Sequence, residues 1–532
     1  MSASFRHAWR FWLAALAFAW LVDFLFWRKP LGISFPLWVL VVLAGSLFIG
    51  LVEGHRPHLR TLLLMALTLA AALITVLRNE VMTRFLNAVL SLGLLLLLAD
   101  TYSNGFWLFY RLGDYFKALA RLTRAALVDP FRLGKATALP AGAEDVPFWR
   151  LVWRKFVPVL RGLVLALPVV IVLGALLASA DPIFADWMKS LLKVFDLSRL
   201  FEYLFRLFYI LILAYAFAGL LTHAIHPQQE ADQPDPQRGW FKPFLGALES
   251  GVVLFCVDLL FLVFVIIQFR YFFGGQANIT ETGYTYSEYA RRGFGELVTV
   301  AVLSLLLYLS LASITRLDTP VRRRSFTLLS VFLMMMVLVM LVSAYQRLWL
   351  YESAYGFTQL RTYTHVFIPW LGALLLAVVV FEMIQQRGRF GLALLIFNIG
   401  FVLTLGVLNV DGFIARQNIR RTLQGEALDL SYLSSLSSDA VPVILQEFDN
   451  PALMQETHDQ LGGELACRAA LLLEEEKRPW QAFHLSTQTA RSLLFARHSE
   501  WQAYPISRQG SGWLWVTVNG ETRPCRMTVF WD

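Results

Sequence analysis

The sequence predicts an α-helical polytopic membrane bundle of about eleven transmembrane helices, followed by a small C-terminal α+β domain. Two observations support this prediction. Of the 532 residues, 57% are hydrophobic and only 16% are charged, whereas soluble domains are typically about 45–50% apolar and about 25% charged. The apolar residues also gather into runs of roughly 20, the length that a helix needs to cross about 30 Å of hydrocarbon.

Eleven runs meet this criterion, although their edges are approximate. They lie at about 11–27, 36–53, 59–77, 82–100, 158–180, 201–222, 244–269, 295–315, 326–346, 363–385 and 391–410. Leucine and valine fill them over lengths that exceed the short alternating segments of barrel strands. Because backbone groups in lipid must hydrogen-bond within the segment, these runs predict helices. Asp23 interrupts the first run and no small-residue cleavage site follows, so we expect a retained helix and not a signal peptide.

The runs divide the chain into four parts. Residues 1–105 hold four transmembrane helices, residues 106–157 form a basic cytoplasmic amphipathic segment and loop, residues 158–410 form a seven-helix membrane domain, and residues 411–532 form an extracytoplasmic domain. Within the last part, Pro442 fits the first turn of a helix. Asn519 and Gly520 predict the tight turn of a hairpin, and Pro524 predicts that its second strand lies at a sheet edge.

Basic residues predict the orientation of the helices. Lysine and arginine are concentrated in the stretch 111–155 and in the turn around Arg322 and Arg324, which are separated by an even number of crossings. By the positive-inside rule both are cytoplasmic. We therefore expect a multi-pass membrane protein, with its N-terminus cytoplasmic and its C-terminus extracytoplasmic. The formal charge of +8 is then explained by orientation and lipid contact, so we expect no nucleic-acid partner.

The three cysteines are too few for a disulfide scaffold. Cys256 lies in the middle of an apolar run. Cys467 and Cys525 both fall in the outward C-terminal part, where an oxidising compartment would allow them to pair. Spacing alone leaves this disulfide open, because pairing requires Cα atoms within about 7 Å.

A polar cluster is predicted at the outer face, where loops from three parts of the chain would converge. Arg347, Tyr351 and Tyr355 recur every four residues and share a helix face beside Glu352. Gly356 fits a left-handed helix end and Thr358 can cap the next helix. The full set of candidate ligand-binding residues comprises Glu288, Arg291, Arg347, Tyr351, Glu352, Tyr355, Arg361, Asn409, Asp411 and Asn418.

Two interpretations of this cluster stay open. Arginine offers bidentate geometry to phosphate and carboxylate, so the cluster could bind an anionic lipid headgroup, a sugar phosphate or a peptide. Aromatic belts and arginines at membrane interfaces also occur without any ligand, and a glutamate beside an arginine can simply fix a helix end.

Asp258 is a separate candidate, because it lies near the middle of an apolar run. An ionised carboxylate there costs at least about 2.5–3.5 kcal/mol unless it meets a partner or a polar cavity. It could be a protonated, hydrogen-bonded acid, a ligand for a coupling ion or a proton carrier. The histidine pairs His55 with His58 and His223 with His226 lack a third ligand nearby, so we expect no metal site and no cofactor.

Four phrases together resemble a known family: SEYARRGFGELV (287–298), LYESAYGFTQLR (350–361), NVDGFIARQNIRR (409–421) and LSYLSSLSSDAVP (430–442). They resemble a bacterial family of polytopic membrane proteins catalogued as domains of unknown function, in the pair numbered forty-one fifty-three and forty-one seventy-three. The resemblance covers about residues 240–442. It implies a bacterial inner-membrane location and no known activity, and it therefore carries over no catalytic residue.

Three classes of function remain, and no motif in the chain identifies a reaction. Binding or transport related to the cell envelope fits the helix count and Asp258; beyond the bilayer itself, the ligand would be an envelope lipid, an ion or a small anionic molecule. A membrane enzyme acting on a lipid-linked substrate would use the outer polar cluster. A sensor or scaffold would use the C-terminal domain to receive a signal or a partner.

Overall fold

The computed structural model describes residues 8–137, 197–225, 243–273, 294–474, 478–509 and 513–525, with scattered positions between 158 and 186. The chain divides into two compact units. Unit 1 comprises Met1–Trp27, Gly45–His55 and Leu122–His226, and unit 2 comprises Arg28–Ala44, Arg56–Arg121 and Pro227–Asp532. Each unit is described by itself.

Ten helices in the described part of the chain are long and apolar enough to cross a membrane. They match ten of the eleven expected runs, and the remaining run, about 158–180, lies outside the described residues apart from scattered positions. The ten helices are α1 (Ala8–Phe26), α2 (Ser34–Val52), α3 (Leu59–Leu77), α4 (Val81–Thr101), α8 (Leu197–Ile225), α9 (Ala247–Phe273), α12 (Phe294–Ile314), α13 (Pro320–Tyr355), α14 (Gln359–Met383) and α15 (Phe390–Leu408). The prediction of a membrane-embedded helical protein is thus confirmed.

Helix α13 is much longer than the run that predicted it. Its 36 residues correspond to about 54 Å of helix, against about 30 Å of hydrocarbon. Thr319 caps its first turn by accepting a hydrogen bond from the backbone of Arg322, and Pro320 begins it. The polar stretch that ends at Tyr355 is therefore a continuation of a membrane helix beyond the apolar part.

In unit 1, α1 packs against α8 and a buried ion pair joins them. Asp23 of α1, which is 4% exposed, accepts a hydrogen bond from Arg206 Nε of α8 at 2.8 Å and contacts the hydroxyl of Tyr209. The indole of Trp27 donates to Glu202 at 2.7 Å. The negative charge of Asp23 is thus compensated by an arginine of another helix, as a buried carboxylate requires.

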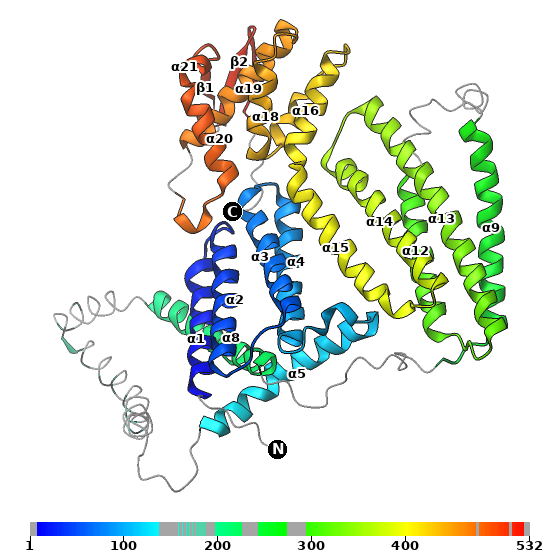
Figure 1. Ribbon diagram of the computed structural model, residues 1–532. Coiled ribbons are helices and arrows are strands. Elements are labelled where there is room, and N and C mark those ends of the chain that lie inside the picture. Colours follow the sequence, from blue (N-terminus) through cyan, green and yellow to red (C-terminus); the bar gives the residue numbers. More distant parts are fainter. Residues whose placement is uncertain are drawn as a thin grey trace. The chain divides into compact units, whose positions relative to one another are not determined.

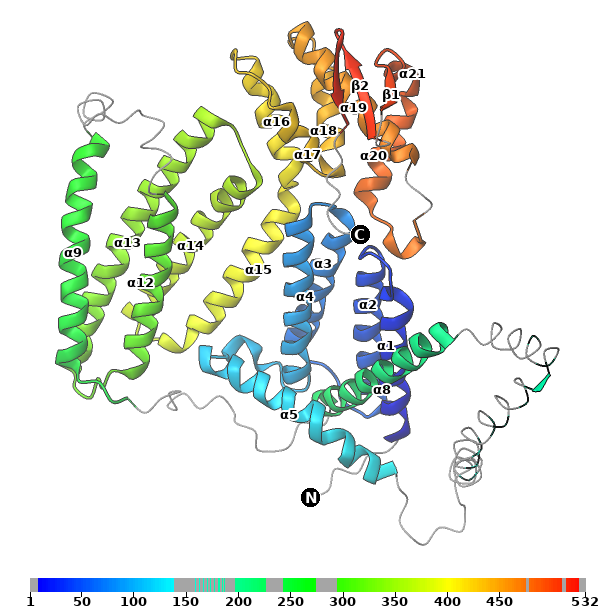
Figure 2. The ribbon, with the colours of Figure 1, turned by 180° about the vertical axis from the view of Figure 1, so that it is seen from behind.

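In unit 2, α13 is the central helix of a group that includes α9, α12 and α14 (Figure 1). Large apolar side chains such as Leu333, Val337, Leu371 and Leu375 form its core. Helix α15 packs on α14 and on the hairpin of α3 and α4. The view from behind shows the same neighbours (Figure 2). At one end of this group Glu382 is 1% exposed and accepts hydrogen bonds from Arg387, Tyr308 and Thr327, so this acid is also neutralised by an arginine.

The C-terminal domain combines short helices with one small sheet. Its helices are α16 (Val410–Thr422), α17 (Leu430–Ser435), α18 (Val441–Phe448), α19 (Gln455–Glu474), α20 (Leu485–Ala496) and α21 (His498–Trp501). The strands β1 (Ile506–Gln509), β2 (Trp513–Val518) and β3 (Glu521–Pro524) form an antiparallel sheet in the order β1-β2-β3. This α+β architecture was expected.

The hairpin of β2 and β3 follows the turn chemistry that predicted it. Asn519 and Gly520 have φ angles of 51° and 85°, and Pro524 lies on an edge strand. Strand β1 was not expected.

Cys525, which follows β3, forms a disulfide with Cys467 of α19, and their Cα atoms lie 5.3 Å apart. The disulfide attaches the sheet edge to α19.

The C-terminal domain is bonded to two turns of unit 2 that adjoin membrane helices. In the turn before α4, the backbone N–H groups of Asn79 and Glu80 donate to Asp439 Oδ2 at 2.8 and 2.9 Å. Near α2, the N–H of Ile33 donates to the carbonyl of Phe483 at 3.0 Å. These turns therefore lie at the same end of unit 2 as the domain.

Candidate functional site

The structure brings two of the three predicted polar stretches together, the one at 347–361 and the one at 409–418, at the junction of α13, α14 and α16. Asn418 of α16 bonds to both backbone groups of Phe357, because its Oδ1 accepts from the N–H at 2.7 Å and its Nδ2 donates to the carbonyl at 2.9 Å. Gly356 has a φ of 80°, and a Cβ there would lie 2.6 Å from Arg421 Nη1. The turn between α13 and α14 therefore requires glycine and is held by α16.

Asp411 is a buried acid of this junction. It is fully buried and accepts hydrogen bonds from Gln359 Nε2 and from the backbone N–H of Ser437, both at 2.7 Å. Burial raises the pKa of its carboxyl group to about 6, and the charge of Glu80 acts in the same direction, while the two hydrogen bonds oppose the rise. Asp411 thus links the start of α14 to the C-terminal domain.

Asn409 has a local structural role at the start of α16. Its φ is 54°, its Oδ1 accepts from the N–H of Gly412 at 3.1 Å, and its Nδ2 donates to the carbonyl of Asp439 at 3.1 Å. Asparagine tolerates this left-handed conformation and is a favoured helix cap. Thr358 occupies the cap position of α14, but the expectation that its side chain caps this helix is wrong, because it makes no capping hydrogen bond.

A second network runs between α13 and α14 and contains Glu352. Its carboxylate is fully buried, and Oε2 lies 2.8 Å from Nδ1 of His365. The other ring nitrogen of His365, Nε2, lies 2.7 Å from the hydroxyl of Tyr345. Glu352 Oε1 has no hydrogen-bond partner among the described residues. The His365 side chain is 27% exposed, so this chain of three groups is reachable from outside the helix pair.

Arg361 lies one turn before His365 on the same face of α14. Its guanidinium carbon lies 4.0 Å from the ring centroid of Tyr351, and Nη1 donates to the carbonyl of Gly356 at 2.5 Å. No hydrogen bond is formed by its Nε or Nη2 within the described chain. Tyr355 stacks edge-on against Tyr351, with ring centroids 5.1 Å apart, and is 51% exposed. This arrangement leaves part of an arginine fork available to an anion.

Other predicted residues lie outside these two networks. Arg347 Nη2 donates to Gln268 Oε1 of α9 at 2.8 Å, and Ser343 donates to the same oxygen at 3.1 Å, so Arg347 connects α13 to α9. Glu288 and Arg291 lie outside the described residues. The described segment next to them begins at Phe294, whose ring centroid lies 6.1 Å from that of Tyr351.

Asp258 is 3% exposed on α9, inside a membrane-spanning helix. Neither of its carboxylate oxygens has a hydrogen-bond partner in the part of the chain that the structure describes. Its helix packs on α13. An ionised acid in this position is unfavourable, so the site accommodates the neutral acid better than the carboxylate.

Three residues of these networks were not predicted from the sequence: His365, Tyr345 and Gln359. His365 and Tyr345 lie at the ends of apolar runs, and a single histidine or tyrosine in such a run is a weak signal. Gln359 is uncharged and lies beside the charged residues of its stretch, so its bond to Asp411 has no sequence signal. Glu352, thirteen residues before His365, carried the only sequence signal for a hydrogen-bonded pair across the turn.

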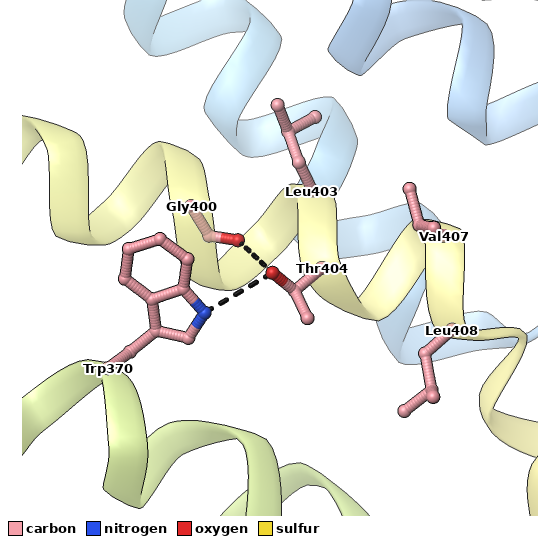
Figure 3. A pocket seen from close by; sticks show the side chains of 6 residues that line it. All are labelled: Trp370, Gly400, Leu403, Thr404, Val407 and Leu408. Atoms are coloured by element: carbon pink, nitrogen blue, oxygen red, sulfur yellow. Dashed lines mark hydrogen bonds between the residues drawn. The ribbon is translucent and has the colours of Figure 1, made fainter.

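An apolar groove lies between α14 and α15 (Figure 3). Its volume is about 410 Å³, and it is lined by Trp370, Gly400, Leu403, Thr404, Val407 and Leu408. The indole of Trp370 donates to Thr404 Oγ1 at 3.2 Å. Trp370 and Arg361 are nine residues apart and therefore on opposite faces of α14. The groove is thus not an extension of the polar site.

No group of three or more histidine, cysteine, aspartate or glutamate side chains in the described ranges has the arrangement of a metal site. His226, one of the four histidines considered above, lies outside those ranges.

Comparison with known proteins identifies a family. The family model described as Domain of unknown function (DUF4153) matches residues 63–447. The match covers most of the chain, from within α3 to α18, and so extends further towards the N-terminus than the four phrases that resembled the family. The chain belongs to this family. Neither the search of curated proteins nor the search of solved structures finds a match.

Proposed function

We propose that this member of the DUF4153 family is a bacterial inner-membrane protein that binds, and in a transport cycle moves, an anionic component of the cell envelope at its extracytoplasmic side. The binding surface consists of Arg361, Tyr351 and His365 at the ends of α13 and α14, and we call it the α13–α14 site. The observation that carries the proposal is the half-buried Arg361, whose Nε and Nη2 are free of partners in the described chain.

Two observations support an extracytoplasmic position for this site. The disulfide between Cys467 and Cys525 belongs in an oxidising compartment. The domain that contains it is bonded to the turn beside the site through Asn418 and Asp411. The basic turn at Arg322–Arg324 lies at the opposite end of α13, which the positive-inside rule assigns to the cytoplasm.

The chemistry of the site favours a phosphate or phosphodiester group. Arginine binds such groups through two parallel charge-assisted hydrogen bonds, and Arg361 is already held by Gly356 and by the face of Tyr351. A preordered arginine loses less side-chain entropy on binding. A lipid headgroup and a soluble phosphate ester share this chemistry.

The test measures the affinity of the purified full-length chain in non-ionic detergent for short-chain phosphatidylglycerol, with phosphatidylcholine and glycerol 3-phosphate as comparison ligands. We expect Arg361→Gln to weaken binding of phosphatidylglycerol about tenfold or more, since one charge-assisted hydrogen bond contributes about 1.5–3 kcal/mol. The matched control is Arg420→Gln, because Arg420 belongs to the same junction but is neutralised by Glu447 at 3.1 Å. Equal affinities of wild type and Arg361→Gln would overturn the proposal. Comparison of the lipid with glycerol 3-phosphate distinguishes a lipid from a soluble ligand.

A second candidate function is a membrane enzyme, and the chain Glu352–His365–Tyr345 favours it. A carboxylate that orients a histidine, which in turn contacts a hydroxyl, is an arrangement used for general acid–base catalysis. In such an enzyme, Tyr345 transfers a proton to or from a lipid-linked substrate. Turnover of an added phospholipid that is lost in Tyr345→Phe but retained in Arg361→Gln would favour catalysis over binding.

A further inference from the structure

Four exposed apolar side chains lie close together where the C-terminal domain meets the turn between α1 and α2. Trp480, Phe483 and Leu485 belong to the segment that leads into α20 and are 53%, 39% and 45% exposed, and Leu31 of the turn is 49% exposed. Within this segment Gln481, Ala482 and His484 are buried. Exposed and buried residues are thus interspersed along the segment. The large apolar side chains point outward, and the buried residues attach the segment to the protein.

Short contacts attach this segment to the turn, and all of them lie within unit 2. The N–H of Ile33 donates to the carbonyl of Phe483 at 3.0 Å, and His484 Nε2 lies 2.7 Å from the carbonyl oxygen of Leu31. A Cβ at Gly32 would lie 2.6 Å from the carbonyl carbon of Ala482. The two backbones are therefore in direct contact, and only glycine allows this approach.

The position of the turn in the membrane follows from its connections. It joins two membrane-spanning helices, since α1 ends at Phe26 and α2 begins at Ser34. A connection this short keeps the turn at the boundary between hydrocarbon and headgroups. The segment 480–485 is bonded to that turn, and α20 also packs on α3. The exposed side chains of the segment consequently lie at the level of the bilayer surface.

We infer that Leu31, Trp480, Phe483 and Leu485 form a membrane-anchoring surface, through which the C-terminal domain inserts into the headgroup region of the leaflet at its own end of the bundle. Tryptophan and phenylalanine are enriched at this depth, because a ring can bury its apolar part among acyl chains while its edge stays near water. The occupant of this surface is the lipid of the bilayer that α2 and α3 cross. The inference is independent of the ligand proposed for the α13–α14 site.

The test is a depth measurement by spin labelling of the full-length chain. Cys256 is replaced by alanine, and the disulfide between Cys467 and Cys525 is kept, because it does not react with the label. Single cysteines are then placed at Trp480, Phe483 and Leu485. Leu473 and Trp513, which are 59% and 53% exposed on α19 and β2, provide matched controls in the same domain. Power saturation in phosphatidylcholine–phosphatidylglycerol vesicles compares the accessibility of each label to oxygen, which partitions into lipid, and to a water-soluble nickel chelate.

We expect the labels at 480, 483 and 485 to be more accessible to oxygen than to the nickel chelate, and the labels at 473 and 513 to show the reverse. Equal nickel accessibility at all five positions would overturn the inference, because the segment would then be in water. Low accessibility to both reagents would also overturn it, because the surface would then be covered by protein. Thermal unfolding of each variant shows whether it folds. If the Trp480 variant does not fold, positions 483 and 485 still provide the test.

Discussion

Nδ1 of His365 lies 2.8 Å from Oε2 of Glu352, although the two residues belong to different helices. The fully buried carboxylate can only accept, so Nδ1 carries a proton and donates it. In the neutral ring Nε2 is then the acceptor, and it receives the hydroxyl proton of Tyr345 at 2.7 Å. One buried acid thus determines the tautomer of the histidine and the direction of the tyrosine hydroxyl.

Replacing Glu352 by alanine is expected to destabilise the pair of α13 and α14. The change leaves Nδ1 of His365 without its buried acceptor, and an unsatisfied group of this kind costs about 1–3 kcal/mol. The melting temperature of the detergent-solubilised chain measures this loss. Ser353→Ala is the control, because Ser353 is exposed and bonds only within its own helix. Equal melting temperatures of the two variants would contradict the role assigned to Glu352.

Asn418→Ala is expected to loosen the turn between α13 and α14. It removes two hydrogen bonds to Phe357, and each bond contributes about 0.5–1.5 kcal/mol. Hydrogen exchange of residues 354–360, followed by mass spectrometry, should become faster. The control is Asn398→Ala, since the exposed Asn398 donates only to Leu394 of its own helix. Unchanged exchange in the Asn418 variant would show that the turn is held by other contacts.

The contact between the C-terminal domain and the turn at Leu31 is expected to weaken at acid pH. Burial, reinforced by the charge of Arg84, lowers the pKa of His484 to about 4. The unfolded chain, with a histidine pKa of about 6.5, therefore binds the proton first as the pH falls. Stability from this residue is complete above about pH 6.5 and is lost between that value and about 4. Melting temperatures of wild type and His484→Gln at pH 7.5 and 5 test this. Their difference should change with pH, whereas the exposed His498→Gln should follow wild type at both values.

Asp411 is expected to have the opposite effect from His484, because its protonation at acid pH stabilises the folded chain. Its folded pKa of about 6 lies above the ordinary value of 3.8, so the folded chain binds the proton first. Acidification from about pH 6 towards 4 therefore stabilises the junction through this residue. In Asp411→Asn this contribution is absent, and the melting temperature should fall more steeply between pH 7 and 5 than in wild type. A parallel pH profile of the two proteins would contradict the raised pKa.

Removing the disulfide is expected to destabilise the C-terminal domain. Cys467 and Cys525 are separated by 58 residues, and a cross-link over such a loop contributes about 4 kcal/mol in the chain-entropy description. The double variant Cys467→Ser with Cys525→Ser should therefore lose protection from protease in residues 455–525. Cys256→Ala removes the free cysteine and is the control. Equal protease resistance of the double variant and the control would show that the disulfide is dispensable.

The sequence predicts most of the membrane part, because apolar length is a strong and local signal. Ten of the expected spans correspond to described helices, and Asn519 with Gly520 correctly predicted the hairpin. Hydropathy does not indicate the end of α13, but the four-residue spacing of Arg347, Tyr351 and Tyr355 and the glycine at 356 predicted it, and the helix does end at Tyr355 with Gly356 as its C-cap. Strand β1, a short segment of only four residues, gave no clear alternating pattern.

The candidate site was predicted less completely, because its contacts join residues that are far apart in sequence. The gathering of Gln359, Asp411 and Asn418 depends on how α14 and α16 pack, which hydropathy does not specify. Two residues considered for ligand binding have structural contacts that the sequence did not indicate: Asn418 holds the turn between α13 and α14, and Asn409 caps α16. The pairing of His365 with Glu352 is known only from the structure. Whether Arg361 binds a ligand stays a prediction.

The central claim is that the α13–α14 site and the C-terminal domain share the extracytoplasmic face. Single cysteines at Ser353, Ser325 and Ser499, all exposed, are introduced into the Cys256→Ala chain and treated in intact cells with a membrane-impermeant maleimide. The account predicts labelling at positions 353 and 499 and none at 325 until the cells are opened. Labelling at 325 with protection of 353 and 499 would show that the orientation is reversed and that the site faces the cytoplasm.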